Sequence, residues 1–172
     1  LLSLHLGQGA RWHTLVSLCG FTHFLTSAGQ HAGVHPLVLK RMLRKAGTNL
    51  LEVIADFHSQ CGATSASSND SSTPLKENQC STRLLADLRS MEELNCRGAL
   101  QTALEQGALL HSITCTEDRI VPADLSAACF QNPALATAPK QLTHHVQEGQ
   151  HADFMTHPAR YTWLIDQLQL AP

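Results

Sequence analysis

The chain has 172 residues, of which 43% are hydrophobic and 15% are charged, and its formal net charge is -2 at pH 7. Such a chain supplies enough apolar side chains for a sizeable core in one domain, which excludes wholesale disorder. A charge this close to zero gives no general basic field and argues against a nucleic-acid binder. The sequence also lacks the run of about 18 apolar residues that a membrane helix needs. We therefore expect a soluble, cytoplasmic protein with no membrane or nucleic-acid partner.

The first third of the sequence predicts a helix end, a strand and a helical hairpin. Residues 1–9 have the pattern of a helix end closed by glycine, and residues 12–19 form a compact apolar run that is typical of a buried strand. Pro36 suits the first position of a helix that runs to about Ala46, and Thr48 can cap a second helix. The apolar stripe of that second helix consists of Leu50, Ile54, Phe57 and Cys61.

The first helix of this hairpin has one apolar and one basic face. Its apolar face is predicted to consist of Val38, Leu39, Met42 and Leu43. Its basic face consists of Lys40, Arg41, Arg44 and Lys45. Two interpretations of the basic face stay open, because a solvated helix surface and a surface that steers an acidic partner have the same composition.

The middle of the chain combines a polar loop with further helices. Small polar residues dominate residues 62–81, which cannot bury enough surface to become well ordered and are predicted to form a flexible loop or linker. Residues 82–95 carry leucines at helical spacing, and a short helix is expected near residues 99–105.

The last third predicts strands separated by helices. Residues 108–115 and 141–146 have the character of strands, and Pro122 and Pro158 can each open a helix. Strands that alternate with helices indicate a parallel sheet with crossover connections. The fold class is therefore predicted to be α/β, with an inserted helical segment between about residues 34 and 105.

Cysteine and histidine are frequent, but their spacing does not predict a metal or cofactor site. The six cysteines include no Cys-x-x-Cys pair, and the eleven histidines show no ligand spacing. His144 and His145 are adjacent, so their side chains point apart on a strand. We expect mostly buried, free thiols and structural or surface histidines.

An acid and an imidazole stand just after two neighbouring strands. Asp118 follows the strand at 108–115, and His151 follows the strand at 141–146. Chemistry in parallel sheets collects at the carboxyl ends of strands, and an acid followed by a histidine is the order of these two residues in the α/β-hydrolase triad. The alternative is structural, since an aspartate in a turn commonly stabilises its own backbone.

The sequence around these two residues resembles the α/β-hydrolases. Residues 116–123, Thr-Glu-Asp-Arg-Ile-Val-Pro-Ala, resemble the strand end that carries their catalytic acid. Residues 150–161, Gln-His-Ala-Asp-Phe-Met-Thr-His-Pro-Ala-Arg-Tyr, resemble their catalytic-histidine turn and are particularly similar to the pimeloyl-acyl-carrier-protein methyl ester esterases of biotin synthesis. Residues 14–21, 33–39 and 94–100 fit the same order of parts.

The resemblance implies a serine carboxylesterase that needs no cofactor or metal. In such an enzyme His151 is the general base and then the general acid, and Asp118 orients His151. Residues 1–33 and 106–172 would belong to the hydrolase core, and residues 34–105 would form a helical lid. The substrate would be a small-molecule ester or a pimeloyl ester on acyl-carrier protein, whose acidic surface could meet Lys40, Arg41, Arg44 and Lys45.

The Gly-x-Ser-x-Gly turn that holds the nucleophile of this family is not in the sequence. The order of elements places the expected serine a few residues before Leu1. Ser3 lacks flanking glycines and Ser17 lies within a predicted strand, so neither is a good substitute. A second hypothesis therefore stands beside the esterase, namely a non-catalytic truncated or degenerate hydrolase that acts as a binding module.

Overall fold

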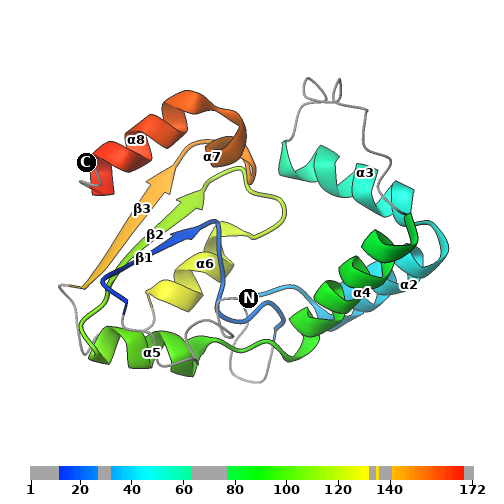
Figure 1. Ribbon diagram of the computed structural model, residues 1–172, viewed down its shortest axis with the longest axis horizontal. Coiled ribbons are helices and arrows are strands. Elements are labelled where there is room, and N and C mark those ends of the chain that lie inside the picture. The colour runs from blue at the N-terminus through cyan, green and yellow to red at the C-terminus, as the bar shows by residue number, and fades with distance from the viewer. Residues whose placement is uncertain (1–11, 27–31, 63–76, 132–134, 136–140, 169–172) are drawn as a thin grey trace.

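The structure is a computed structural model that describes residues 12–26, 32–62, 77–131, 135 and 141–168. The predicted helix end at residues 1–9 and most of the predicted loop at 62–81 lie outside these ranges. The described chain is built around three strands with helices on both faces of the sheet (Figure 1). The strands are β1 (Thr14–Leu18), β2 (Leu109–Cys115) and β3 (Leu142–Gln147).

The sheet is parallel throughout and its strands lie in chain order, β1-β2-β3. Leu15 pairs with Leu110 across the first ladder, and Ile113 pairs with His145 across the second. Because successive side chains alternate between the two faces, Leu110 faces one side of the sheet and Ile113 the other. The predicted α/β class with a parallel sheet is therefore confirmed for the described residues.

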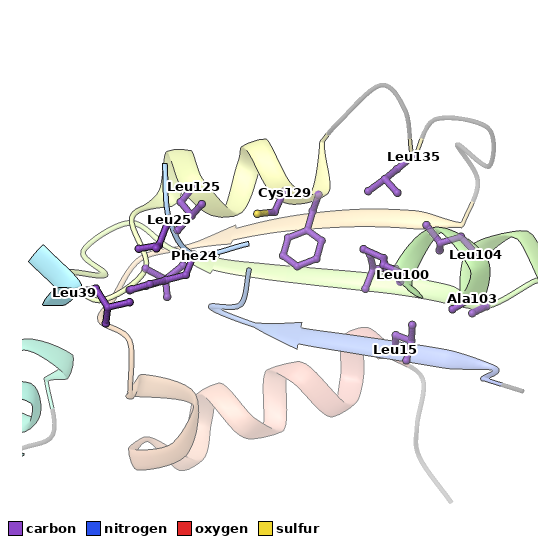
Figure 2. Packing of buried hydrophobic residues seen from close by; sticks show 14 residues of the cluster. Leu15, Phe24, Leu25, Leu39, Leu100, Ala103, Leu104, Leu125, Cys129 and Leu135 are labelled. Carbon is purple, nitrogen blue, oxygen red and sulfur yellow. The ribbon is translucent and has the colours of Figure 1, made fainter. Parts of the chain in front are cut away.

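Helices cover both faces of this sheet. The helix α6 (Ala123–Phe130) packs on one face, and α7 (Asp153–Thr156) and α8 (Pro158–Leu168) lie on the other. Figure 2 shows Leu125 and Cys129 reaching from α6 toward the strands. Both are fully buried in the main core, which also takes in Leu100 of α5 (Arg97–Glu105). A smaller cluster on the opposite face joins Ile113 to Phe154 of α7.

Three further helices form an arm beside the sheet (Figure 1). They are α2 (Pro36–Thr48), α3 (Leu50–Cys61) and α4 (Glu77–Glu93). Ala46, Val53 and Leu88 pack together where these helices meet. Leu39 of α2 is completely buried in the main core, where Figure 2 shows it beside Phe24. The far end of the arm returns to the sheet, because the Ala152 amide donates a hydrogen bond to the carbonyl of Cys61 over 2.9 Å.

Several details of the predicted hairpin were wrong. The cap of α3 is Asn49 rather than Thr48, because the Asn49 side chain accepts a hydrogen bond from the Glu52 amide. The Thr48 hydroxyl instead donates to the carbonyl of Lys45, inside the preceding helix. Val38 was assigned to the apolar face of α2 but is 53% exposed, since only the Leu39 side of that helix meets the sheet core.

The stripe assigned to α3 was wrong in part, because it included Phe57 and left out Val53. Val53 and Cys61 are the buried residues of α3, whereas Phe57 is 42% exposed and lies beside the loop that follows β3. In addition, α4 begins at Glu77, inside the segment predicted as a loop, because glutamate and glutamine favour helix even in a polar sequence. Among the residues that the structure describes, no helix is both long and apolar enough to cross a bilayer.

Candidate active site

Asp118 occupies a tight turn directly after β2. The turn is closed by a hydrogen bond from the Asp118 amide to the carbonyl of Cys115, 3.3 Å away. The Oδ1 atom of Asp118 accepts hydrogen bonds from the amides of Ile120 and Val121, both at 2.8 Å. These bonds fix the carboxylate and leave its second oxygen, Oδ2, for a different partner. The local backbone role that we weighed for this aspartate is therefore real, but it uses only half of the carboxylate.

His151 stands in the loop after β3, at the same edge of the sheet. The two loops are joined by a hydrogen bond from the Glu117 amide to the carbonyl of Gly149, over 2.9 Å. Gly149 has a φ of 126°, which a side chain rarely adopts, and this lets the chain turn sharply ahead of His151. Phe57 of α3 meets the imidazole edge to face, with ring centroids 6.5 Å apart. The arm therefore places an aromatic side chain against the candidate site.

The structure brings the two predicted residues together. Nδ1 of His151 lies 2.7 Å from Oδ2 of Asp118, which is a short, direct hydrogen bond. The Asp118 side chain is fully buried, whereas 26% of the His151 side chain is exposed. One end of the pair is thus shielded from water, and the other end can reach a second molecule.

The surroundings of Asp118 favour its charged form. Burial alone would raise the pKa of this carboxyl, but the hydrogen bonds from His151 and from the Val121 amide outweigh burial, so its pKa is lowered. A carboxylate can only accept hydrogen bonds, so Nδ1 of His151 must carry the shared proton. The lone pair of the neutral imidazole is then on Nε2, where it can accept a proton from a hydroxyl or thiol. This arrangement is suited to general base and general acid catalysis.

A third residue, Cys19, lies at this site and was not predicted there. Cys19 immediately follows β1 and is 3% exposed. Its φ of 45° is in the left-handed region, the one such non-glycine residue in the described ranges. Strand alternation would put Cys19 on the Leu15 side of the sheet, but the left-handed turn puts it in the cluster with Ile113 and Cys115. Sequence reasoning missed Cys19 because nothing in its neighbourhood signals that backbone reversal.

The thiol of Cys19 is held in its neutral form. A side-chain hydrogen bond with Cys115 is the largest influence and burial the next, and both raise the pKa of Cys19. The described cysteines are otherwise as expected, because Cys61, Cys96, Cys115 and Cys129 are all buried and free. In the absence of another reactant, Cys19 is therefore a neutral thiol beside a charged carboxylate.

The basic residues of α2 lie apart from the Asp118–His151 pair. Lys40, Arg41 and Arg44 are exposed. Lys45 is engaged within the arm, since its ammonium group lies 2.6 Å from Asp56 and 2.8 Å from Glu52. These acids of α3 neutralise part of the basic face, so at most three of its four cations point freely into solvent. Their proposed contact with a carrier protein stays a prediction.

Of the two serines considered as nucleophiles, only Ser17 falls within the described residues. Ser17 lies within β1, as predicted, and Ser3 is outside the described residues. In the part of the chain that the structure describes, Asp118 is the hydrogen-bond partner of the His151 ring. Comparisons with models of protein families and with curated proteins found no match for this chain. The class of protein therefore has to be argued from the fold and from the site itself.

Proposed function

We propose that this protein is a serine carboxylesterase in which Asp118 and His151 are the acid and the histidine of the catalytic triad. The observation that carries the proposal is the 2.7 Å hydrogen bond between Asp118 Oδ2 and His151 Nδ1 at the carboxyl edge of a parallel sheet. The two residues follow neighbouring strands in the order acid then histidine. Both the position and the order support an α/β-hydrolase fold for the sheet.

The chemistry follows from the tautomer of the imidazole. His151 Nε2 accepts the proton of a serine hydroxyl as that oxygen bonds to the ester carbonyl carbon. The imidazolium that results is stabilised by the ionised Asp118 and returns its proton to the leaving alkoxide, which departs as an alcohol. Water then hydrolyses the acyl-enzyme with His151 again acting as base. The resemblance implies that this serine lies in a Gly-x-Ser-x-Gly turn.

The arm is proposed to act as the lid over this site. Its helix α3 contacts the site directly, through the ring of Phe57 against His151 and through the bond between the Ala152 amide and the Cys61 carbonyl. An aromatic ring beside the imidazole offers an apolar surface to the acyl or alcohol part of an ester. A pimeloyl methyl ester on acyl-carrier protein is the proposed natural substrate, and Lys40, Arg41 and Arg44 the proposed contacts to the acidic carrier.

The test is ester hydrolysis by the protein expressed from its full reading frame. With p-nitrophenyl butyrate as substrate, we expect His151→Ala and Asp118→Asn to lower kcat by about 10⁴-fold or more. His157→Ala is the matched control, because His157 is an exposed histidine six residues further along and pairs only with groups of its own helical segment. Its kcat should stay within about twofold of the wild type.

Two outcomes would overturn this proposal. Hydrolysis that survives His151→Ala undiminished would remove the triad assignment. Absence of any hydrolysis in the wild type, for both the p-nitrophenyl ester and a pimeloyl methyl ester, would favour the non-catalytic binding module instead. A circular dichroism spectrum of each variant shows that a loss of activity is not a loss of fold.

A further inference from the structure

We propose that Cys19, Asp118 and His151 form a binding site for one Zn²⁺ ion. One donor atom of each residue lies within 4.8 Å of the donor atoms of the other two. The three side chains come from the ends of three adjacent parallel strands, so the sheet itself brings them together. No other trio of His, Cys, Asp or Glu within the described ranges meets this distance. The proposal does not depend on the esterase activity, although it uses two of the same side chains.

The separations of the donors bracket those of a tetrahedral zinc site. Nitrogen and oxygen ligands lie about 2.0–2.2 Å from Zn²⁺ and sulfur about 2.3 Å, which puts ligand atoms roughly 3.3–3.6 Å from one another. Nδ1 of His151 lies 2.7 Å from Oδ2 of Asp118, and all donor pairs of the trio lie within 4.8 Å. Shifts of about 1 Å are therefore sufficient, and His151 is partly exposed and can make them.

The charges of the trio match the ion. A Cys19 thiolate, an Asp118 carboxylate and a neutral His151 imidazole together carry two negative charges, which Zn²⁺ cancels. Cys19 is 3% exposed and the Asp118 side chain is fully buried. A neutral set of groups is far less costly in such a place than an isolated charge. Binding releases the thiol proton to solvent, so no other reactant is needed.

The donor types select among metals. Magnesium and calcium take oxygen ligands almost exclusively, so a thiolate and an imidazole argue against both. Zinc accepts sulfur, nitrogen and oxygen together, and a site with three protein ligands keeps its fourth position for water. The exposed side of His151 is the side from which the ion and that water would enter.

Two features show that the ligands are positioned in advance. The left-handed backbone of Cys19, which residues other than glycine rarely adopt, turns the thiol out of the strand alternation and toward Asp118. The amides of Ile120 and Val121 hold Oδ1 of Asp118 and so aim Oδ2 at the same point. Hydrogen bonds that orient a ligand in this way are the usual second layer of a metal site.

The test uses Co²⁺ as a spectroscopic substitute and Zn²⁺ in calorimetry, on the intact, reduced protein. A thiolate bound to Co²⁺ gives a sulfur-to-metal charge-transfer band, which we expect to saturate at one equivalent. In Cys19→Ser the band should disappear, and the affinity for Zn²⁺ should fall by about 100-fold or more. Cys96→Ser is the matched control, because Cys96 is equally buried and free but lies outside the donor trio.

The proposal fails if the wild type gives no charge-transfer band, or if the band persists in Cys19→Ser. It also fails if Cys96→Ser removes the band and Cys19→Ser does not. Should Cys19→Ser not fold, His151→Ala replaces it, since this partly exposed side chain is not part of the core and its loss should weaken Zn²⁺ binding to the same extent. The metal would occupy atoms of His151 and Asp118 that the triad uses, so ester hydrolysis is measured after EDTA treatment and the band after addition of Co²⁺. A protein with the band that stays inactive without metal contradicts the esterase alone, and an active protein that gives no band with Co²⁺ contradicts the metal site alone.

Discussion

Asp118, at the edge of the sheet, has both a structural role and a proposed chemical role. Asp118 gives one oxygen to the backbone of its turn and the other to His151. An asparagine at position 118 can keep the turn. Its amide can present either an oxygen that accepts or an NH₂ group that donates to His151, so it no longer fixes the imidazole tautomer. This is why we expect Asp118→Asn to preserve the fold and still to lose most of the activity.

Two partly buried histidines in the sheet, His111 and His144, make the stability of the fold depend on pH. His111 of β2 stacks on His145 of β3 with ring centroids 5.8 Å apart, and Trp163 covers His145 edge to face. Burial first, and then the neighbouring His145, lower the pKa of His111, and the same two causes lower the pKa of His144. The folded protein therefore keeps His111 and His144 neutral at a pH where the same residues of the unfolded chain take up protons.

The sign of the resulting pH dependence is fixed by that difference. As the pH falls below about 6.5, the ordinary value for histidine, the unfolded state binds protons that the folded state does not, so stability decreases. We expect urea unfolding to give a smaller free energy at about pH 5.5 than at about pH 7.5, and His111→Gln to make that decrease smaller. A wild type that becomes more stable at the lower pH, or an unchanged decrease in the variant, would contradict this explanation.

At the scale of elements, α2 is joined to α3 by ion pairs and to the sheet core by a buried side chain. Lys45 with Glu52 and Asp56 links α2 to α3, but these groups are all well exposed, so the ion pairs contribute little to stability. The completely buried Leu39 joins α2 to the main core, next to Phe24. Burial of Leu39 therefore attaches the arm to the sheet, whereas the ion pairs act only between two helices of the arm.

Truncation of Leu39 tests that comparison. Leu39→Ala should lower the free energy of unfolding by about 2–5 kcal/mol, because it leaves a cavity in a fully packed place. Val38→Ala, in the same helix but 53% exposed, should change it by less than about 0.5 kcal/mol. Equal effects of the two substitutions in urea titrations would show that α2 packs by a different face.

The elements were largely predictable because they depend on local patterns. The apolar runs of β1 and β2 and the prolines that open α2 and α8 are signals that a short window contains. The wrong details depend on contacts far along the chain. Whether Val38 is buried depends on where α2 meets the sheet. Helical periodicity alone could not decide whether Val38 or Leu39 faces the core.

The candidate site was likewise predictable only where it depends on local patterns. Asp118 and His151 could be named because parallel strands end at one edge and because their neighbourhoods resemble a known pattern. Cys19 could not, since its place depends on a left-handed backbone that the residue type does not favour. The contact of Phe57 with His151 depends on the direction of the whole arm, which no local pattern contains.

At the scale of the whole molecule, a three-stranded parallel sheet carries an acid–histidine pair at its carboxyl edge and an arm that contacts the histidine. The arm contacts this edge through the ring of Phe57 against His151 and through the hydrogen bond from the Ala152 amide to the Cys61 carbonyl. The central claim is that this pair activates a serine. The division into a core at residues 1–33 and 106–172 and a lid at 34–105 is part of that claim and stays a prediction.

Labelling with a fluorophosphonate, which bonds covalently to activated serines, is the most direct test of whether Asp118 and His151 activate a serine. We expect the protein from its full reading frame to be labelled at one serine, located by mass spectrometry in a Gly-x-Ser-x-Gly segment. The labelling rate should fall by about 10³-fold or more in His151→Ala and remain near the wild-type rate in His157→Ala. No labelling of the wild type, or equal rates in wild type and His151→Ala, would show that His151 does not activate a serine.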